Sequence, residues 1–141
     1  MSVQGIPAEG LKTVGQIVGT NGLRFHAAHN ALAIAAEILS SHISGAPVID
    51  DQGKFIGFIS EFDVLEALES GQQLEKTTAR DIMNPAHIAV HESTSITEAI
   101  RLMKEKNLLH LPVEKNGKVR YAVTRHDLLR ARIGLGLDIE S

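Results

Sequence analysis

Hydrophobic residues are distributed in the same way in the two halves of the chain. Each half contains a stretch in which apolar residues recur at positions i, i+3, i+4 and i+7, as on one face of a helix. These positions are Ala31, Ile34, Ala35 and Ile38 in the first half, and Ile96, Ala99, Ile100 and Met103 in the second. A capping residue precedes each stretch. Asn30 caps the first helix, and Ser95 and Glu98 form a capping box in which Glu98 reaches back.

Short extended segments surround each of these two predicted helices. Strands are expected at residues 14–18 and 23–26 before the first helix, and at residues 79–83 and 87–91 before the second. A hairpin follows each helix and turns at Asp51-Gln52-Gly53 or at Asn116-Gly117, the latter a type I′ signal. The returning strands cover residues 55–59 and 119–123, and a last helix starts after Ser60 or Thr124. The predicted order is β-β-α-β-β-α in each half.

The two halves are copies of one unit. Residues 13–17 correspond to 78–82 and residues 42–48 to 107–113, both at an offset of 65, and residues 60–65 correspond to 124–129 at an offset of 64. Ordered similarity at a near-constant offset is the signature of an internal repeat. The predicted organisation is an N-terminal segment (1–12), a first repeat (13–70), a polar linker (71–77), a second repeat (78–133) and a C-terminal tail (134–141). One repeat leaves a face of its sheet uncovered, so the two sheets are expected to pack face to face with pseudo-two-fold symmetry.

These residues resemble a pair of CBS domains, also called a Bateman module, over residues 13–133. The resemblance rests on five pieces in order: Gly45-Ala46-Pro47-Val48 with Asp50, the hairpin with Gly57, Ser60-x-x-Asp63, His110-Leu111-Pro112-Val113 and Thr124-x-x-Asp127. It implies an α/β (α+β) fold of two tandem repeats that binds an adenine nucleotide (AMP, ADP or ATP) in the cleft between them. It also implies a flat homodimer that signals to a protein target. The sequence departs from the family pattern at Tyr121, where glycine is usual, and at Val18, where methionine is usual.

The Ser/Thr-x-x-Asp pattern has two interpretations. A carboxylate in the first turn of a helix can accept both ribose hydroxyls, and the hydroxyl and N–H groups at the helix start can meet a phosphate. The same pattern is also an ordinary helix cap. Asp63 with Ser60, and Asp127 with Thr124, therefore remain open between ligand binding and capping on the residues alone.

The family resemblance implies that each site draws on both repeats. The residues implied for the Asp127 site are Thr13, Val18, Ile43, Ser44 and Ala122, and those for the Asp63 site are Thr78, Met83, Leu108, Leu109 and Phe58. The apolar members of both sets could equally be core residues. The basic residues around Asp127 are His110, Arg125, His126 and Arg130, where the first repeat has Gly45, Glu61, Phe62 and Glu66. Because acidic groups repel a phosphate, the Asp127 site is predicted to be the better nucleotide site. Magnesium bridging the phosphates is compatible with this site.

Composition narrows the class of function. The chain of 141 residues has 14 basic and 17 acidic residues, which argues against a nucleic-acid binder, and it has no cysteine. Neither a signal peptide nor an apolar run of membrane-spanning length is apparent, so a cytoplasmic protein without membrane association is expected. If extended, His87 and His91 lie about 13 Å apart, too far for one metal ion. No catalytic motif occurs, so a binding module rather than an enzyme is predicted.

Two alternatives to a sensor of adenine nucleotides remain. One is an interaction module with no small ligand, and the other is a sensor of a different adenosyl ligand, S-adenosylmethionine or a cyclic dinucleotide. The apolar positions expected to support dimerisation are Val64, Leu68, Leu128 and Ile133.

Overall fold

The computed structural model describes residues 11–17 and 22–134, which fall into two compact units. Residues 23–88 and 116–119 form the first-repeat unit, and residues 11–17, 22, 89–115 and 120–134 form the second-repeat unit. The units do not follow the repeats in order along the chain. The opening segment of each repeat folds with the body of the other, so that residues 11–17 lie in the second-repeat unit and residues 78–88 in the first.

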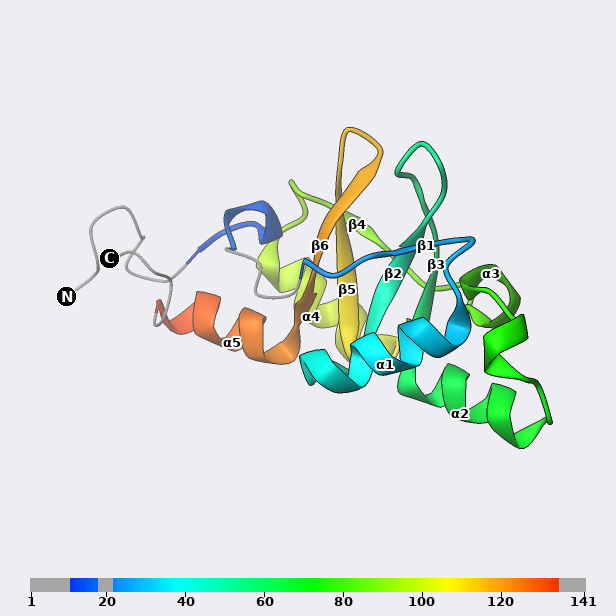
Figure 1. The fold of residues 1–141 in the computed structure, drawn as a ribbon. Helices are drawn as coiled ribbons and strands as arrows, with labels where there is room; N and C mark the ends of the chain where they lie inside the picture. Colours follow the sequence, from blue (N-terminus) through cyan, green and yellow to red (C-terminus); the bar gives the residue numbers. More distant parts are fainter. Residues whose placement is uncertain (1–10, 18–21, 135–141) are drawn as a thin grey trace. The chain divides into compact units, whose positions relative to one another are not determined.

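The first-repeat unit is a three-stranded sheet with helices. The strands β1 (Phe25–His26), β2 (Gly45–Ile49) and β3 (Phe55–Ser60) are ordered β1-β2-β3, with β1 parallel to β2 and β2 antiparallel to β3. The helices are α1 (Ala31–Ser41), α2 (Glu61–Glu69) and the short α3 (Ala79–Ile82) (Figure 1). The largest fully buried side chains of this unit are Phe25, Ile34, Pro47, Val48 and Ile59.

The second-repeat unit has the same construction. The strands β4 (Val90–His91), β5 (His110–Lys115) and β6 (Lys118–Thr124) are ordered β4-β5-β6, and β4 is parallel to β5. The helices are α4 (Ile96–Glu105) and α5 (Arg125–Ile133), and a 3₁₀ turn covers Val14–Gln16. The largest fully buried apolar side chains are Val14, Ile96, Leu111, Val113 and Val123. The predicted α+β architecture of two tandem repeats is confirmed, although each described sheet has three strands where the sequence predicted four.

Three of the local sequence signals are confirmed. The side chain of Asn30 accepts hydrogen bonds from the N–H groups of Leu32 and Ala33 at the start of α1. The side chain of Ser95 accepts one from Glu98 N–H at 3.0 Å. Asn116 and Gly117 both have positive φ angles, 55° and 77°, as a type I′ turn requires.

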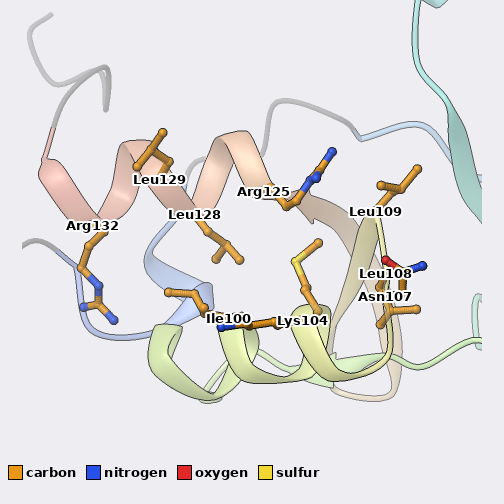
Figure 2. A pocket seen from close by; sticks show the side chains of 10 residues that line it. Ile100, Lys104, Asn107, Leu108, Leu109, Arg125, Leu128, Leu129 and Arg132 are labelled. Atoms are coloured by element: carbon orange, nitrogen blue, oxygen red, sulfur yellow. The ribbon is translucent and has the colours of Figure 1, made fainter.

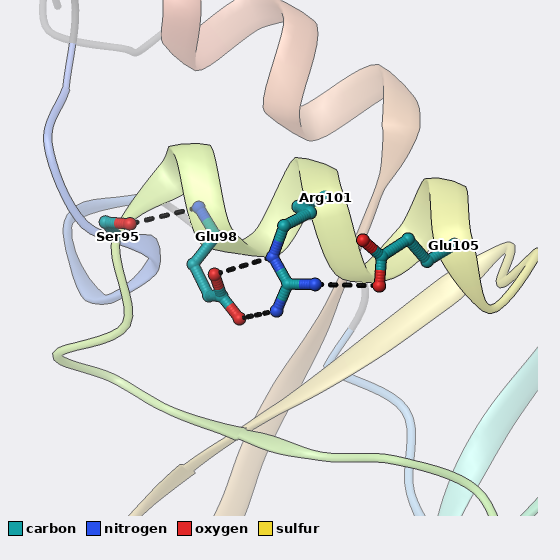
Figure 3. A network of polar contacts seen from close by, with 4 residues as sticks. All are labelled: Ser95, Glu98, Arg101 and Glu105. Carbon is teal, nitrogen blue, oxygen red and sulfur yellow. Dashed lines mark hydrogen bonds and ion pairs between the residues drawn. The ribbon is translucent and has the colours of Figure 1, made fainter.

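The expectation that the Glu98 carboxylate reaches back to Ser95 is wrong. Both carboxylate oxygens of Glu98 instead bind the guanidinium of Arg101, which also donates to Glu105 at 2.7 Å (Figure 3). Residues three and four positions apart face each other on a helix, so Arg101 competes directly for Glu98. The hydrogen bond from Arg101 lowers the pKa of the Glu98 carboxyl.

The expectation of a strand at the start of each repeat is also wrong. The described part of residues 14–18 contains a 3₁₀ turn, and residues 79–82 form α3. The cause is a capping box in both places. Gln16 Oε1 accepts hydrogen bonds from Thr13 N–H, and Asp81 Oδ2 accepts them from the N–H and Oγ1 of Thr78 at 2.9 and 3.1 Å.

The polar segment 71–77 is tied to the first-repeat unit. It contains a 3₁₀ turn (Leu74–Lys76) whose Leu74 side chain is buried in the core. The carbonyl of Thr77 accepts a hydrogen bond from Ala31 N–H at 2.9 Å. This linker is therefore held at the start of α1. None of the described helices combines the length and apolar character that a membrane crossing requires.

Candidate functional site

The junction between β3 and α2 holds the first candidate carboxylate. Asp63 Oδ2 accepts hydrogen bonds from the N–H of Ser60 at 2.7 Å and from its Oγ at 3.0 Å. Asp63 N–H donates back to Ser60 Oγ at 3.2 Å. This reciprocal arrangement is a capping box, and it fixes the carboxylate at the N-terminus of α2.

The junction between β6 and α5 repeats this geometry. Asp127 Oδ2 accepts hydrogen bonds from the N–H and Oγ1 of Thr124 at 3.0 and 3.2 Å. The second oxygen, Oδ1, lies 4.0 Å from Nη1 of Arg130, one turn further along α5. Asp127 is only 2% exposed, whereas Asp63 is partly exposed. The two junctions share their capping geometry but differ in burial and in charge.

Both junctions are helix caps. At Asp63, capping still leaves acceptor positions on the carboxylate that a ligand could use. An ionised carboxylate has about four acceptor positions. At Asp63 the cap uses Oδ2, so a second acceptor oxygen remains on the same rigid carboxylate. The cap positions a group that could also accept a ribose hydroxyl.

Two of the residues implied for the Asp63 site lie side by side in the first-repeat unit. Phe58 and Asn84 exchange backbone hydrogen bonds of 2.8 and 3.0 Å, which holds the residue after Met83 against β3. A Cβ built on Gly57 would lie 2.6 Å from Met83 Sδ, so the methionine packs where glycine leaves space. Met83 therefore packs against β3 beside the buried Phe58.

His87 packs against the same strand and was missed as a site residue. Its ring stacks on Phe58 with the centroids 4.2 Å apart and the planes at 17°, and it meets Phe55 edge-on at 6.5 Å. Phe58 is buried and His87 is partly exposed, so the imidazole is the part of this stack that suits contact with a base. The sequence offered only a histidine in a short extended segment, and the stacking partner lies 29 positions earlier in the chain.

Thr78 takes part in a different cleft of the first-repeat unit. Its hydroxyl donates to Asp81, and the residue lines a cleft of about 410 Å³ at the turn end of the β2–β3 hairpin. His26, Asp50, Asp51 and Arg80 line the same cleft, and His26 Nε2 lies 2.5 Å from Asp51 Oδ1.

The remaining implied residues divide between the units. Ile43 packs against the core of the first-repeat unit, and the carbonyl of its neighbour Ser44 accepts a hydrogen bond from Glu61 N–H at 3.0 Å. In the second-repeat unit, Thr13 forms a β-bridge with Ser95 and Ala122 is fully buried. Val18 lies outside the described residues.

The basic residues expected around Asp127 occupy three kinds of position. His110 is buried, Arg130 is paired with Asp127, and Arg125 and His126 are exposed. Arg125 lies with Leu108 and Leu109 along a groove of about 460 Å³ between α4 and α5 (Figure 2). Arg125 therefore supplies positive charge to the groove between α4 and α5.

Tyr121 stands where the first repeat has Gly57, and its side chain makes a hydrogen bond to the backbone. Its hydroxyl donates to the carbonyl of Val14 at 2.7 Å, which ties β6 to the opening 3₁₀ turn. Burial raises the pKa of the phenol, and the nearby carboxylate of Glu92 raises it further.

Tyr121→Phe is expected to lower the free energy of unfolding by about 1 kcal/mol at pH 7, because one partly buried hydrogen bond is lost. The pKa of this phenol is raised in the folded protein above its ordinary value of 10.0. The contribution of the Tyr121 phenol to the free energy of unfolding is therefore fully present below pH 10. It is lost as the pH rises through the pKa of the phenol in the folded protein. Urea denaturation at neutral pH and above pH 10 measures both effects. An undiminished difference between the two proteins at high pH would contradict this account.

Two of the four positions expected to support dimerisation are core residues. Val64 and Leu128 are 8% and 4% exposed, whereas Leu68 and Ile133 are 48% and 55% exposed. The inward positions of α2 and α5 were mistaken for outward ones because both faces of these helices carry leucine or valine. Within residues 11–17 and 22–134, no group of three or more His, Asp or Glu side chains could hold a metal ion.

Comparison with known protein families identifies one domain type in both repeats. The family model of the CBS domain matches residues 28–70 and 79–134. The uncharacterized protein MK0525 of Methanopyrus kandleri is 30% identical over 130 residues, which cover 91% of this chain and 66% of that protein. The chain spans about two thirds or less of the length of the first curated relatives that it matches.

Two solved structures share the fold. The crystal structure of CBSX2 in complex with AMP has a TM-score of 0.72 at 27% identity, covering 84% of this chain and 94% of that one. The CBS domain pair of protein MJ0100 in complex with 5′-methylthioadenosine and S-adenosyl-L-methionine also has a TM-score of 0.72, at 25% identity, and covers 84% and 93%. All three ligands contain an adenosyl group.

Proposed function

Because this chain belongs to the CBS domain family, we propose that it is a regulatory module that binds an adenine nucleotide and passes the signal to a protein partner. The observation that carries the proposal is the paired junction. Ser60 with Asp63, and Thr124 with Asp127, place a fixed carboxylate and a hydroxyl at a helix N-terminus in each unit. Carboxylates there suit ribose hydroxyls, and the helix N-terminus suits a phosphate.

The adenosyl ligands of two similar structures support this choice of ligand class. AMP, ADP and ATP are the proposed ligands, and S-adenosylmethionine is the nearest alternative of the same chemistry. In the same unit as Asp63, the partly exposed ring of His87, which stacks on the buried Phe58, offers an aromatic face for a base. At Asp127 the arginines of α5 offer positive charge for a phosphate, and magnesium would be held by the phosphates rather than by a protein site.

The proposed mechanism is linkage between ligand and assembly. A ligand that binds one arrangement of the module more tightly shifts the population toward that arrangement. The module carries exposed apolar residues on its helices, which suits association with a second copy and with a protein target. We propose a homodimer that acts by binding rather than by catalysis.

A thermal-shift panel with AMP, ADP, ATP and S-adenosylmethionine tests the proposed ligand class. Ligand at a hundredfold excess over its dissociation constant adds about 2.7 kcal/mol of stability. The melting temperature should therefore rise by several degrees for at least one adenosyl compound. Guanosine monophosphate is the matched control, and it should give a smaller shift because the base differs. No shift with any adenosyl compound at millimolar concentration would contradict the proposal.

One observation favours a second candidate function, an interaction module without a small ligand. The Asp127 carboxylate is buried, and its two oxygens are already held by Thr124 and Arg130. A ribose would have to compete with these contacts. The same panel decides between the two functions, since an interaction module would show no shift.

A further inference from the structure

A charged cleft lies at the turn end of the β2–β3 hairpin, within the first-repeat unit. It has a volume of about 410 Å³, and its ionised side chains are those of Asp50, Asp51 and Arg80. The junction proposed for the nucleotide begins at Ser60, at the other end of β3 (Figure 1). Since β3 rises about 3.3 Å per residue from Phe55 to Ser60, about 16 Å separate the two ends. The cleft is therefore distinct from the proposed nucleotide site.

Asp50 brings to the cleft a carboxylate that the hairpin turn holds in place. Its Oδ1 accepts hydrogen bonds from the N–H groups of Gln52 and Lys54, both at 2.9 Å. The hydrogen bond from Lys54 lowers the pKa of the Asp50 carboxyl, which keeps the group ionised at neutral pH. Both hydrogen bonds go to one oxygen, so Oδ2 remains an acceptor on a side chain that lines the cleft.

His26 holds a second carboxylate beside the first. Its Nδ1 accepts a hydrogen bond from Ala28 N–H at 3.1 Å, which places the ring proton on Nε2. Nε2 then donates to Asp51 Oδ1 at 2.5 Å, and Oδ2 of Asp51 remains an acceptor. A neutral imidazole orients Asp51 without cancelling its charge. Two adjacent carboxylates of this kind suit an ammonium group, which donates three hydrogen bonds.

Arg80 supplies a positive charge to the same cleft. Its backbone N–H donates to the carbonyl of Ala27 at 3.0 Å, which fixes the start of the side chain beside the cleft. Its charge acts on Asp50. Among residues 11–17 and 22–134, however, the guanidinium has no hydrogen-bond or ion-pair partner. A guanidinium with free donors suits a carboxylate, which it can bind through two parallel hydrogen bonds.

The second-repeat unit lacks both charges at the equivalent positions. With an offset of 65 residues, Asp50 corresponds to Lys115 and Arg80 to Gly15. Lys115 is already paired with Glu92, at 3.8 Å. A Cβ built on Gly15 would lie 2.6 Å from the carbonyl oxygen of Glu92, so an arginine does not fit there. The charged cleft is therefore a property of the first repeat and not of the repeated fold.

We propose that this cleft binds a free α-amino acid, with the ammonium group held by Asp50 and Asp51 and the carboxylate held by Arg80. Asp50 and Arg80 interact electrostatically without forming an ion pair, so a ligand that carries both charges can bridge them. A simple anion would also meet two carboxylates, and a simple cation would also meet the guanidinium. A zwitterion complements both signs of charge. This inference goes beyond the proposed nucleotide sensor and does not depend on it.

Calorimetric titration with the standard L-α-amino acids, one at a time at millimolar concentration, tests the proposal. At least one of them should bind. Arg80→Gln and Asp50→Asn should each raise its Kd by about tenfold or more, since each removes a hydrogen bond between charged groups. Lys76→Gln and Glu69→Gln are the matched controls. They remove exposed charges of the same unit that do not line the cleft, and they should leave the Kd unchanged.

Acetate and methylamine, each carrying one half of the ligand's charge, define the outcomes that would overturn the proposal. Each should bind at least about tenfold more weakly than the amino acid, because it makes only one of the two charged contacts. Acetate that binds as tightly would make the cleft an anion site, and methylamine that binds as tightly would make it a cation site. Failure of every amino acid to bind, or binding that neither cleft variant weakens, also contradicts the proposal.

Two further measurements keep folding and nucleotide binding apart from this result. Asp50→Asn keeps an oxygen for the backbone hydrogen bonds of the turn. If it does not fold, Asp51→Asn removes a carboxylate of the same cleft at an exposed position. Titration of the same variants with AMP reports the proposed nucleotide site, and its Kd should not change. Loss of amino-acid binding with intact AMP binding, or the reverse, assigns a failure to one proposal alone.

Discussion

Replacing Asp127 with alanine is expected to lower the free energy of unfolding by about 2–3 kcal/mol, against about 1 kcal/mol for Asp63→Ala. Both changes remove a capping carboxylate, which costs about 1 kcal/mol. Asp127 is also buried, and its removal leaves Thr124 N–H without its acceptor and Arg130 without its nearby carboxylate. Buried groups that lose a partner cost about 1–3 kcal/mol more.

Urea denaturation of the two variants measures this difference. Asp127→Asn and Asp63→Asn are the matched controls, since the amide keeps an acceptor oxygen in the cap and should recover part of the loss. Equal losses for the two alanine variants would show that the burial of Asp127 adds nothing to its capping role. Titration of the same variants with AMP addresses the ligand. The arginines of α5 predict the larger loss of affinity from Asp127→Ala, and a larger loss from Asp63→Ala would make the first-repeat unit the main site.

The signals that were predictable from the sequence are local. Asn30 and Ser95 cap helices because their side chains reach N–H groups two or three residues ahead, and that geometry is contained in the sequence itself. The Asn116-Gly117 turn is equally local, because few other residue pairs adopt positive φ at both positions. The apolar spacing of α1 and α4 needs no distant partner to be recognised.

The opening segments were mistaken for strands although a local signal was present. Thr78 and Asp81 have the same spacing as Ser60 and Asp63, so the pattern that predicted a helix start at residue 60 also applied at residue 78. The apolar residues between them suggested a strand and received more weight. A run of four residues is too short for hydrophobic periodicity to distinguish a strand from a helical turn.

The grouping of segments into units depends on contacts that no local pattern contains. Residues 11–17 fold with the second repeat through hydrogen bonds from Val14 and Gly15 N–H to the carbonyls of Thr94 and Glu92. The stack of His87 on Phe58 is of the same kind. These contacts join residues tens of positions apart, and only the fold brings them together. The candidate carboxylates could be named from the sequence, whereas the stack of His87 on Phe58 could not.

Gly45→Ala is expected to cost about 3 kcal/mol of stability, because the added methyl group would clash with the backbone of the neighbouring strand. An added Cβ would lie 2.5 Å from the carbonyl oxygen of Ile59 and 2.6 Å from a ring carbon of Phe58. Gly45 is paired with Ser60 in the β2–β3 ladder, so neither strand can move aside without breaking that register. Overpacking a well-packed core costs about 1–3 kcal/mol, and a clash with backbone belongs at the upper end.

Gly57→Ala is the informative comparison. Its added Cβ would also meet an atom at 2.6 Å, but that atom is the sulfur of Met83, at the end of a flexible side chain. Methionine adapts to changed space more easily than backbone does, so a cost of about 1 kcal/mol is expected. Gly22→Ala, with nothing within 4 Å, should be close to neutral. Chemical denaturation ranks the three variants, and equal losses at Gly45 and Gly57 would contradict the distinction. Because Ser60 begins the junction that holds Asp63, Gly45→Ala should also weaken AMP binding at that site, whereas Gly22→Ala should not.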